Sequence, residues 1–333
     1  MTQKQSSPLD YRLIVENSQK LKGAASDREF FRVDTPNSDE SIICMKYHHW
    51  NEGHGGKAED WLTINTFLQK IGIPVPKVVK IDRNNTCIWI EDLGDGTLKT
   101  ISEELIHENY IKALKQVHAL QKVDTSKLPK DFVVFQRAFD YNKLRQEMAL
   151  WETFFLKKLM GPHIKKLSKK TIAKISFELD SLCHEQSKVK KVMVHRDFHS
   201  ENLLANKGKL FWIDFQDMMM GSSHYDLVSL IFDPYVTLSE EIRQDLIERH
   251  KVFYLENINS NEEVYQNDFM GTKLQRLVKI LGSYAYLSID KNKPHYADFI
   301  NPTLQMLSKD ADLFSINYPE LVGFLEFTMN LRR

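Results

Sequence analysis

The first hundred residues alternate short β-rich runs with one helical segment. Four runs of apolar and β-branched residues lie at 29–33, 41–47, 77–81 and 86–91. A stripe at the spacing of one helix face falls between the second and third runs and consists of Trp61, Ile64, Leu68 and Ile71. The Gly- and Pro-containing stretch 72–76 then predicts the end of that helix. This part of the chain therefore predicts a small sheet with one helix.

After residue 101 the apolar spacing becomes helical. Three stripes of the 3.6-residue period begin at Ile111, Leu144 and Ile172. The runs 192–194 and 210–213 interrupt them on either side of a turn at 206–209, which predicts a β-hairpin. The chain is predicted to be helical again from 224 to its end. The pattern favours an α+β fold with a small β-rich N-lobe, 1–93, and a larger helical C-lobe, 94–333, joined by a glycine-containing connector after Glu91.

The charge balance excludes a global basic field. Lys plus Arg and Asp plus Glu are equal at 45 each, so composition gives no reason to expect a nucleic-acid partner or an anionic membrane surface. The three cysteines lack any C-x-x-C spacing, which suits a reducing compartment. No apolar stretch reaches the roughly 20 residues of a membrane span, and the N-terminus has no signal-like apolar segment. We expect a cytoplasmic protein with a small-molecule partner; its oligomeric state does not follow from the sequence.

One segment carries the chemistry. His195, Asp197 and Asn202 form the pattern H-x-D-x-x-x-x-N, and Asp214 follows an apolar run twelve residues after the Asn. Phosphoryl transfer requires a carboxylate near the incoming hydroxyl and hard oxygen ligands for Mg²⁺. We interpret Asp197 as the base and Asn202 and Asp214 as the metal ligands. The alternative is a solvated acidic turn, but the four offsets between two apolar runs favour the catalytic interpretation.

Several segments along most of the chain resemble one superfamily. The chain is similar to the aminoglycoside phosphotransferases and choline kinases, and within them to bacterial kinases that phosphorylate the anomeric hydroxyl of N-acetylmuramate and N-acetylglucosamine. Besides the catalytic loop, the matching segments are 23–28, 72–76, 90–94, 151–155, 213–217, 225–230, 233–235 and 275–282. The resemblance implies a two-lobed protein-kinase-like fold that uses ATP and Mg²⁺.

The resemblance also implies a nucleotide site in the N-lobe. Lys46 ends a β-run and resembles the lysine that meets the α- and β-phosphates, with Glu59 or Asp60 as its acidic partner. The loop before strand 29–33 has a single glycine, with Ser26 and Arg28 as phosphate donors, although Arg28 could equally pair with a carboxylate. Backbone groups of the connector residues Glu91 and Leu93 are expected to contact the adenine.

In the C-lobe, the resemblance supplies acceptor and supporting residues. Asp233, Tyr235 and Arg276 would provide hydrogen bonds and an aromatic face for a sugar, and Arg276 would also suit a carboxylate. An internal Asp233–Arg276 ion pair is an equal alternative. His195 and Asp226 are expected to brace the catalytic loop.

Other functions remain open at this stage. The acceptor could be an aminoglycoside, choline or another sugar. Sites for aminoglycosides and choline normally present many carboxylates, and the segment after 224 is not conspicuously acidic, which weakens these two choices. A nucleotide-binding scaffold without activity is disfavoured because Asp197, Asn202 and Asp214 are all present. Gln216 replaces the glycine of Asp-Phe-Gly, which argues against a switchable protein kinase.

Overall fold

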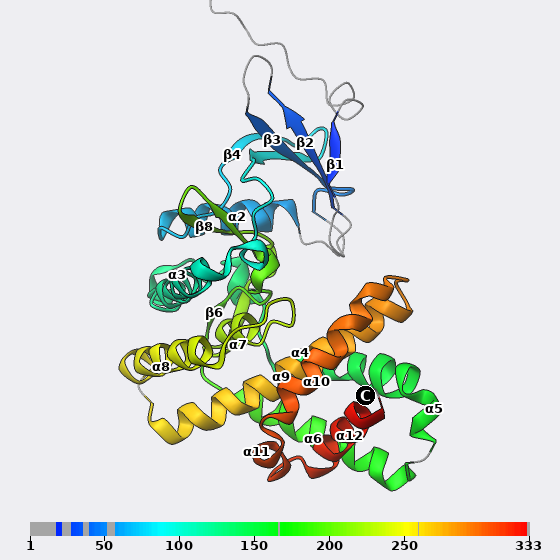
Figure 1. Ribbon diagram of the computed structural model, residues 1–333. Coiled ribbons are helices and arrows are strands. Elements are labelled where there is room, and N and C mark those ends of the chain that lie inside the picture. Colours follow the sequence, from blue (N-terminus) through cyan, green and yellow to red (C-terminus); the bar gives the residue numbers. More distant parts are fainter. Residues whose placement is uncertain are drawn as a thin grey trace, which may run out of the picture. The chain divides into compact units, whose positions relative to one another are not determined.

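The computed structural model describes residues 18–21, 28–35, 40–51, 57–165, 167–258 and 260–331 (Figure 1). The chain forms two compact units. The first unit consists of residues 1–100 and 203–217, and the second of 101–202 and 218–333. The expected lobes 1–93 and 94–333 stay a prediction.

The first unit is built on an antiparallel five-stranded sheet in the order β1-β2-β3-β5-β4. Its strands are β1 (Gln19–Leu21), β2 (Glu29–Asp34), β3 (Ser41–Lys46), β4 (Val78–Asp82) and β5 (Cys87–Glu91). One face buries a cluster of Phe31, Cys44, Cys87 and Trp89. Alternate residues of a strand share a face, so the β-branched and aromatic runs of the sequence produce this cluster.

Helix α2 (Ala58–Lys70) and a short hairpin complete the first unit. Trp61, Ile64 and Leu68 are buried, as their spacing predicts. The hairpin pairs β7 (Leu203–Asn206) with β8 (Lys209–Trp212), and both turn residues between them have positive φ, as a tight two-residue turn requires.

One predicted strand pairing is wrong. β6 (Lys191–Val194) does not pair with the run at 210–213; it pairs with β9 (Met219–Ser222) in the second unit. The partner of β8 is β7, which sequence periodicity did not reveal because only Leu203 of its four residues is buried. The two pairings place the end of β6 and the end of β8 in different units.

The second unit is mainly helical, which confirms the predicted α+β class. Its longer helices are α3 (Glu103–Gln121), α4 (Tyr141–Leu150), α6 (Lys169–Lys188), α7 (Tyr225–Ile231), α8 (Glu240–Asn257), α9 (Glu262–Ile289), α10 (Ile300–Ser308) and α12 (Pro319–Leu331); α5 (Gly161–Ile164) and α11 (Ala311–Ser315) are short. Short 3₁₀ segments lie at 125–127, 133–136, 200–202 and 294–299 in this unit, and at 98–100 and 215–217 in the first. α9 packs against α4, α6, α7 and α10 (Figure 1). None of the described helices is long and apolar enough to cross a membrane.

A π-helix, η4 (Trp151–Leu159), continues directly from α4 and packs along α9. The two backbones approach closely at Gly282, where a Cβ atom would lie 2.7 Å from Trp151 Cα and 2.8 Å from Trp151 N. Only glycine fits this position without movement of one helix. Three residues before it, α9 carries Lys279.

Three histidines form a hydrogen-bonded chain between helices of the second unit. His118 Nε2 lies 3.1 Å from His250 Nδ1, and His250 Nε2 lies 3.1 Å from His224 Nδ1. His224 and His250 are fully buried. Burial lowers the pKa of His118 to about 4 and that of His224 to about 3, and it holds the pKa of His250 well below its ordinary value. The chain is therefore neutral at pH 7.

We expect acid to destabilise the fold through this chain. Unfolded histidines titrate near pH 6.5, so below that pH the unfolded state binds protons that the folded state does not bind. Each such histidine should lower the free energy of unfolding by about 1.4 kcal/mol per pH unit between about pH 6.5 and 4. Urea unfolding at several pH values measures this slope. His250→Gln should flatten it, whereas the exposed His295→Gln should not; equal slopes in all three proteins would contradict the expectation.

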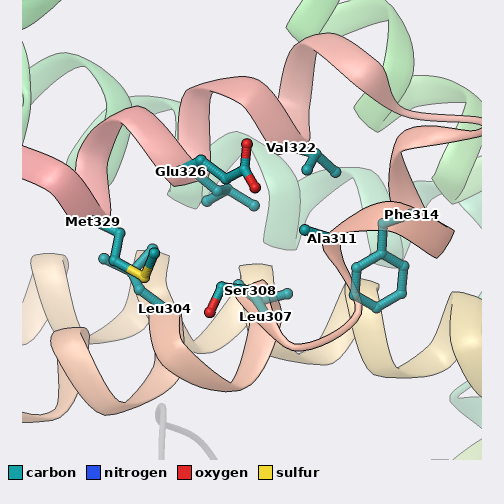
Figure 2. A pocket seen from close by; sticks show the side chains of 9 residues that line it. Leu304, Leu307, Ser308, Ala311, Phe314, Val322, Glu326 and Met329 are labelled. Carbon is teal, nitrogen blue, oxygen red and sulfur yellow. The ribbon is translucent and has the colours of Figure 1, made fainter.

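A small apolar pocket lies between α10, α11 and α12 (Figure 2). Its lining consists of Leu304, Leu307, Ser308, Ala311, Phe314, Val322, Leu325, Glu326 and Met329. None of the residues predicted to carry chemistry belongs to this lining. The pocket is therefore a packing feature of the C-terminal helices and not the candidate site.

Candidate active site

The catalytic loop begins where β6 ends, and Asp226 holds its backbone. The two carboxylate oxygens of Asp226 accept hydrogen bonds from the amides of His195 (2.7 Å) and Arg196 (3.0 Å). Arg196 has a φ of +82°, a conformation that costs energy for a non-glycine residue and persists only when its surroundings enforce it. Burial raises the pKa of Asp226 to about 7, against the opposing effect of the two amides. The loop is thus fixed immediately before Asp197.

Asp197 lies among cationic side chains of the second unit. Its side chain is 27% exposed, and its Oδ1 lies 3.8 Å from Lys279 Nζ. Burial by itself raises the pKa of Asp197, but Lys279, followed by Arg196, Arg276 and His199, lowers it by more. The net pKa is well below the ordinary value, so the carboxylate is ionised at neutral pH and can accept a hydrogen bond from a hydroxyl.

Asn202 turns its amide nitrogen toward the same loop. Its Nδ2 donates to the carbonyl of Asp197 (2.9 Å) and lies 3.2 Å from His199 Nε2. Among the described residues, its Oδ1 has no hydrogen-bond partner. The amide is therefore oriented by the loop, with its oxygen left for another ligand.

Both carboxylate oxygens of Asp233 accept hydrogen bonds from other residues of the protein. Its Oδ2 accepts hydrogen bonds from the amide and hydroxyl of Ser200, at 2.8 and 2.5 Å, and its Oδ1 accepts from the amide of Tyr235 (2.9 Å). The side chain of Asp233 is buried. No ion pair joins it to Arg276 in the part of the chain that the structure describes. The geometry gives Asp233 a bracing position between the catalytic loop and the segment after α7.

Tyr235 belongs to an aromatic group next to the loop. Its ring lies 5.5 Å from that of His199 and 4.6 Å from that of Phe299, and it contacts Tyr284 of α9. Because Tyr235 is partly exposed, its ring is available to a bound molecule.

Arg276 is buried on α9, and its guanidinium is incompletely paired. Its Nε donates to Ser229 Oγ (2.9 Å), and the group lies over the ring of Tyr225 at 5.8 Å. Its Nη1 is buried without a hydrogen-bond partner among the described residues, and so is the hydroxyl of Tyr225. The preceding Gln275 donates to the buried Glu147 of α4 (3.0 Å), which ties the two helices together.

In the first unit, Asp214 lies immediately after β8. Asp214 has a φ of +59°, and its Oδ1 accepts from Arg28 Nη2 (2.6 Å) and Gln216 Nε2 (3.0 Å). Gln216 also accepts from Arg28 Nη1 (2.9 Å), so the three side chains form a closed triangle. Arg28 is buried, and of its two predicted roles the structure shows the carboxylate pair. Among the described residues, Asp214 Oδ2 has no hydrogen-bond partner.

In each unit by itself, the free oxygen of Asn202 or of Asp214 is of the kind that a magnesium ion prefers. Asn202 Oδ1 and Asp214 Oδ2 are both hard oxygen atoms without a protein partner among the described residues, and each belongs to a side chain that its neighbours orient. Those residues contain no cluster of three His, Cys, Asp or Glu side chains that would bind a metal by itself. A magnesium ion would therefore depend on the phosphates and water for its other ligands.

The remaining nucleotide residues lie in the first unit. Lys46 donates to the carbonyl of Asn85. Glu59 accepts from Trp50 (2.8 Å) and pairs with Arg83 (3.0 Å). The predicted pairing of Lys46 with Glu59 or Asp60 stays a prediction.

At the connector, the amide of Glu91 donates to the carbonyl of Lys77 (2.9 Å), and the carbonyl of Leu93 accepts from Asn206 (2.9 Å). The protein thus already uses one backbone group of each connector residue. Their adenine contacts stay predictions, and Ser26 lies outside the described residues.

Sequence reasoning did not include Lys279 among the site residues. It lies 82 positions after Asp197, and only folding brings the two together. The signal in the sequence was its place one helical turn after Arg276, inside the segment 275–282.

A sequence profile of the phosphotransferase enzyme family matches residues 18–259. Four curated relatives match, all named N-acetylmuramate/N-acetylglucosamine kinase. The relative from Neisseria meningitidis serogroup B is 28% identical and covers 91% of each chain. The relative from Pseudomonas aeruginosa is 27% identical and covers 82% of this chain and 77% of its own.

Solved structures with the same fold are more distant in sequence. Ethanolamine kinase from Plasmodium vivax aligns with a TM-score of 0.59 at 16% identity, covering 91% of this chain and 84% of that one. An ADP-bound aminoglycoside phosphotransferase aligns with a TM-score of 0.57 at 13% identity, covering 86% and 92%. These similarities confirm the predicted kinase-like fold.

Proposed function

Since the chain belongs to the phosphotransferase enzyme family and is a small-molecule kinase, we propose that it phosphorylates the anomeric hydroxyl of an N-acetylated hexosamine. The product is then a sugar 1-phosphate. The name shared by the four curated relatives supports an amino sugar as the acceptor.

ATP is the proposed phosphoryl donor, and Asp197 is the proposed base. The ionised carboxylate of Asp197 accepts the hydrogen bond of the acceptor hydroxyl and takes its proton as the oxygen bonds to the γ-phosphorus of ATP. The bond from that phosphorus to the oxygen that bridges to the β-phosphate breaks in the same step, and ADP leaves. Asn202 and Asp214 would hold Mg²⁺, which neutralises phosphate charge when it is bound. Asp226 keeps the catalytic loop in place through the amides of His195 and Arg196.

The observation that carries the choice of acceptor is the positive charge around Asp197. Lys279, Arg196 and Arg276 all act electrostatically on this carboxylate. An aminoglycoside or choline would bring further positive charge to the same place, where like charges repel. A neutral or acidic sugar meets no such repulsion, so the surroundings of Asp197 favour it over a cationic acceptor.

The aromatic group around Tyr235 supports a sugar as well. A ring that is apolar on its face and polar at its edge suits a pyranose, which combines C–H surfaces with hydroxyl groups. Asp233 was predicted to read the sugar, but both of its oxygens accept hydrogen bonds from the protein. We propose a structural role for Asp233 and retain Tyr235 and Arg276 as acceptor residues.

We expect blocking of the anomeric hydroxyl to abolish phosphorylation. N-acetylglucosamine should be converted to its 1-phosphate, whereas its 1-O-methyl glycoside lacks the reacting hydroxyl and should give no product. Phosphorus NMR of the product, with choline and an aminoglycoside as comparison acceptors, measures both points. Equal turnover of the methyl glycoside would show that another hydroxyl reacts, and preferred turnover of a cationic acceptor would contradict the sugar assignment.

A further inference from the structure

A basic stretch without acidic residues runs from the end of η4 into α6. Residues 153–177 contain no Asp or Glu and seven lysines, which are Lys157, Lys158, Lys165, Lys166, Lys169, Lys170 and Lys174. Because the whole chain has equal numbers of acidic and basic residues, acidic residues exceed basic ones by the same number over the rest of the chain. The overall charge balance therefore does not reveal this local positive charge, whose field extends about 10 Å in 0.1 M salt.

Most of these lysines face solvent and are not neutralised by neighbouring acids. The exposed ones without an ion-pair partner in the part of the chain that the structure describes are Lys157, Lys165, Lys169 and Lys170. Lys158 pairs with Asp290 (3.1 Å), and Lys174 pairs with Glu320. α5 follows η4 in the chain and lies at the edge of the second unit (Figure 1). The lysines thus form an accessible basic surface.

The first turn of α6 carries charges opposed to the helix dipole. The N-terminal end of a helix has a partial positive charge and is stabilised by acidic side chains. α2, α3, α8 and α9 each have two acids in the first turn. α6 has none there and begins with Lys169 and Lys170. Lysine at these two positions destabilises the helix, so local stability does not account for them.

An aromatic side chain lies on the same exposed side of α6. Successive residues of a helix are about 100° apart, so Lys170, Lys174 and Phe177 share one side. The opposite side buries Ile175 and Leu179 in the core. Phe177 is 73% exposed, and a phenylalanine ring gains free energy when it leaves water for an apolar phase. The basic surface therefore has an apolar contact among its lysines.

The chemistry of this surface favours a plane of phospholipid headgroups over a nucleic acid. Its charged side chains are all lysines, which are point charges suited to a diffuse negative surface, whereas arginine is the residue that binds phosphate in a bidentate manner. Single strands bind in basic grooves where several aromatic rings stack on bases. One exposed Phe177 on the convex side of a helix suits shallow insertion among anionic headgroups instead.

We propose that the surface formed by the end of η4, α5 and the first turns of α6 binds reversibly to the anionic headgroup surface of a lipid bilayer. The lysines supply the electrostatic attraction, and Phe177 inserts among the headgroups. The surface belongs to folded helices and leaves their buried sides in the protein core. This inference does not depend on the proposed function, since none of its residues belongs to the catalytic loop or to α9.

Sedimentation with lipid vesicles tests the surface. At 0.1 M salt the parent protein should bind phosphatidylcholine vesicles that contain about 30% phosphatidylglycerol, but not vesicles of phosphatidylcholine alone. Salt at 1 M should release it. Lys165→Gln/Lys169→Gln/Lys170→Gln should weaken vesicle binding by about 100-fold, because each lysine near an anionic membrane contributes roughly a factor of five. Absence of binding by the parent protein, or unchanged binding by this triple variant, would overturn the proposal.

Two comparison variants make the result specific. Phe177→Ser should weaken vesicle binding by about 10-fold. Lys122→Gln/Lys127→Gln/Lys130→Gln removes three exposed lysines that follow α3 and should leave binding intact. An equal loss in both triple variants would show that net charge alone attracts the vesicles, against a defined surface. Tighter binding of a duplex DNA or RNA than of the vesicles, measured by fluorescence anisotropy, would overturn the choice of a membrane.

Thermal unfolding separates a binding role of the lysines from a folding role. Lys169→Glu/Lys170→Glu places acids in the first turn of α6, where the dipole favours them. This variant should unfold about 2–5 °C above the parent protein and yet lose its binding to anionic vesicles. A lower unfolding temperature would assign the two lysines to the stability of the fold and overturn the proposal.

Discussion

Asp197→Asn should lower kcat by about 10²–10⁴-fold, which is the usual contribution of a positioned general base. The amide has nearly the same shape as the carboxylate but cannot take the proton of the acceptor hydroxyl. The loop around it should persist, because Asp226 holds the amides of His195 and Arg196 independently of residue 197. Single-turnover kinetics with saturating ATP and acceptor measures the chemical step directly.

Two further measurements make this result specific. Nucleotide affinity and the thermal unfolding temperature should stay close to those of the parent protein, and Asp312→Asn, an exposed substitution of the same kind in α11, should leave kcat unchanged. A decrease of less than about threefold in kcat would remove Asp197 from the role of base. Loss of the fold in Asp197→Asn would assign the residue a structural role instead.

Asp214→Asn should reduce activity by at least about 100-fold and weaken the magnesium dependence of nucleotide binding, since removal of one charge-stabilising group commonly costs 10²–10³ in kcat. Asparagine is the informative substitution. It retains an oxygen that can accept from Arg28 and Gln216, whereas alanine would leave the buried guanidinium without its partner and destabilise the first unit.

Calorimetric titration of ATP with and without Mg²⁺ separates the two effects. The affinity for ATP in the presence of Mg²⁺ should fall in Asp214→Asn, while the affinity for ATP without Mg²⁺ should remain. Asp312→Asn again serves as the matched control. Full activity at ordinary magnesium concentrations would mean that Asp214 orients Arg28 and does not bind the metal.

The sequence predicted the elements better than their pairing. Helix stripes such as Trp61, Ile64 and Leu68 depend on a local period, and the structure confirms their burial. Strand pairing depends on distant partners, and β6 was therefore assigned to the wrong neighbour. The short strand β7 gave no periodic signal, because three of its four residues are only partly buried.

The candidate site shows the same difference between features set by local spacing and features set by distant partners. Spacing within one loop predicts Asp197 and Asn202 as site residues, because the offsets themselves carry the information. Lys279 has no such offset, and its position near Asp197 becomes visible only in the folded chain. Asp233 illustrates the opposite case: the family resemblance predicted a sugar contact, but the hydrogen bonds of Ser200 and Tyr235 occupy its carboxylate.

The close approach of Gly282 to Trp151 fixes the position of the part of α9 that carries Lys279. Lys279 and Arg276 belong to the same continuous helix as Gly282, and a rigid helix transmits a displacement along its length. A methyl group at 282 would push α9 away from η4 and carry both cations with it. The width of a single interhelical contact thus helps to set the distance between Lys279 and Asp197.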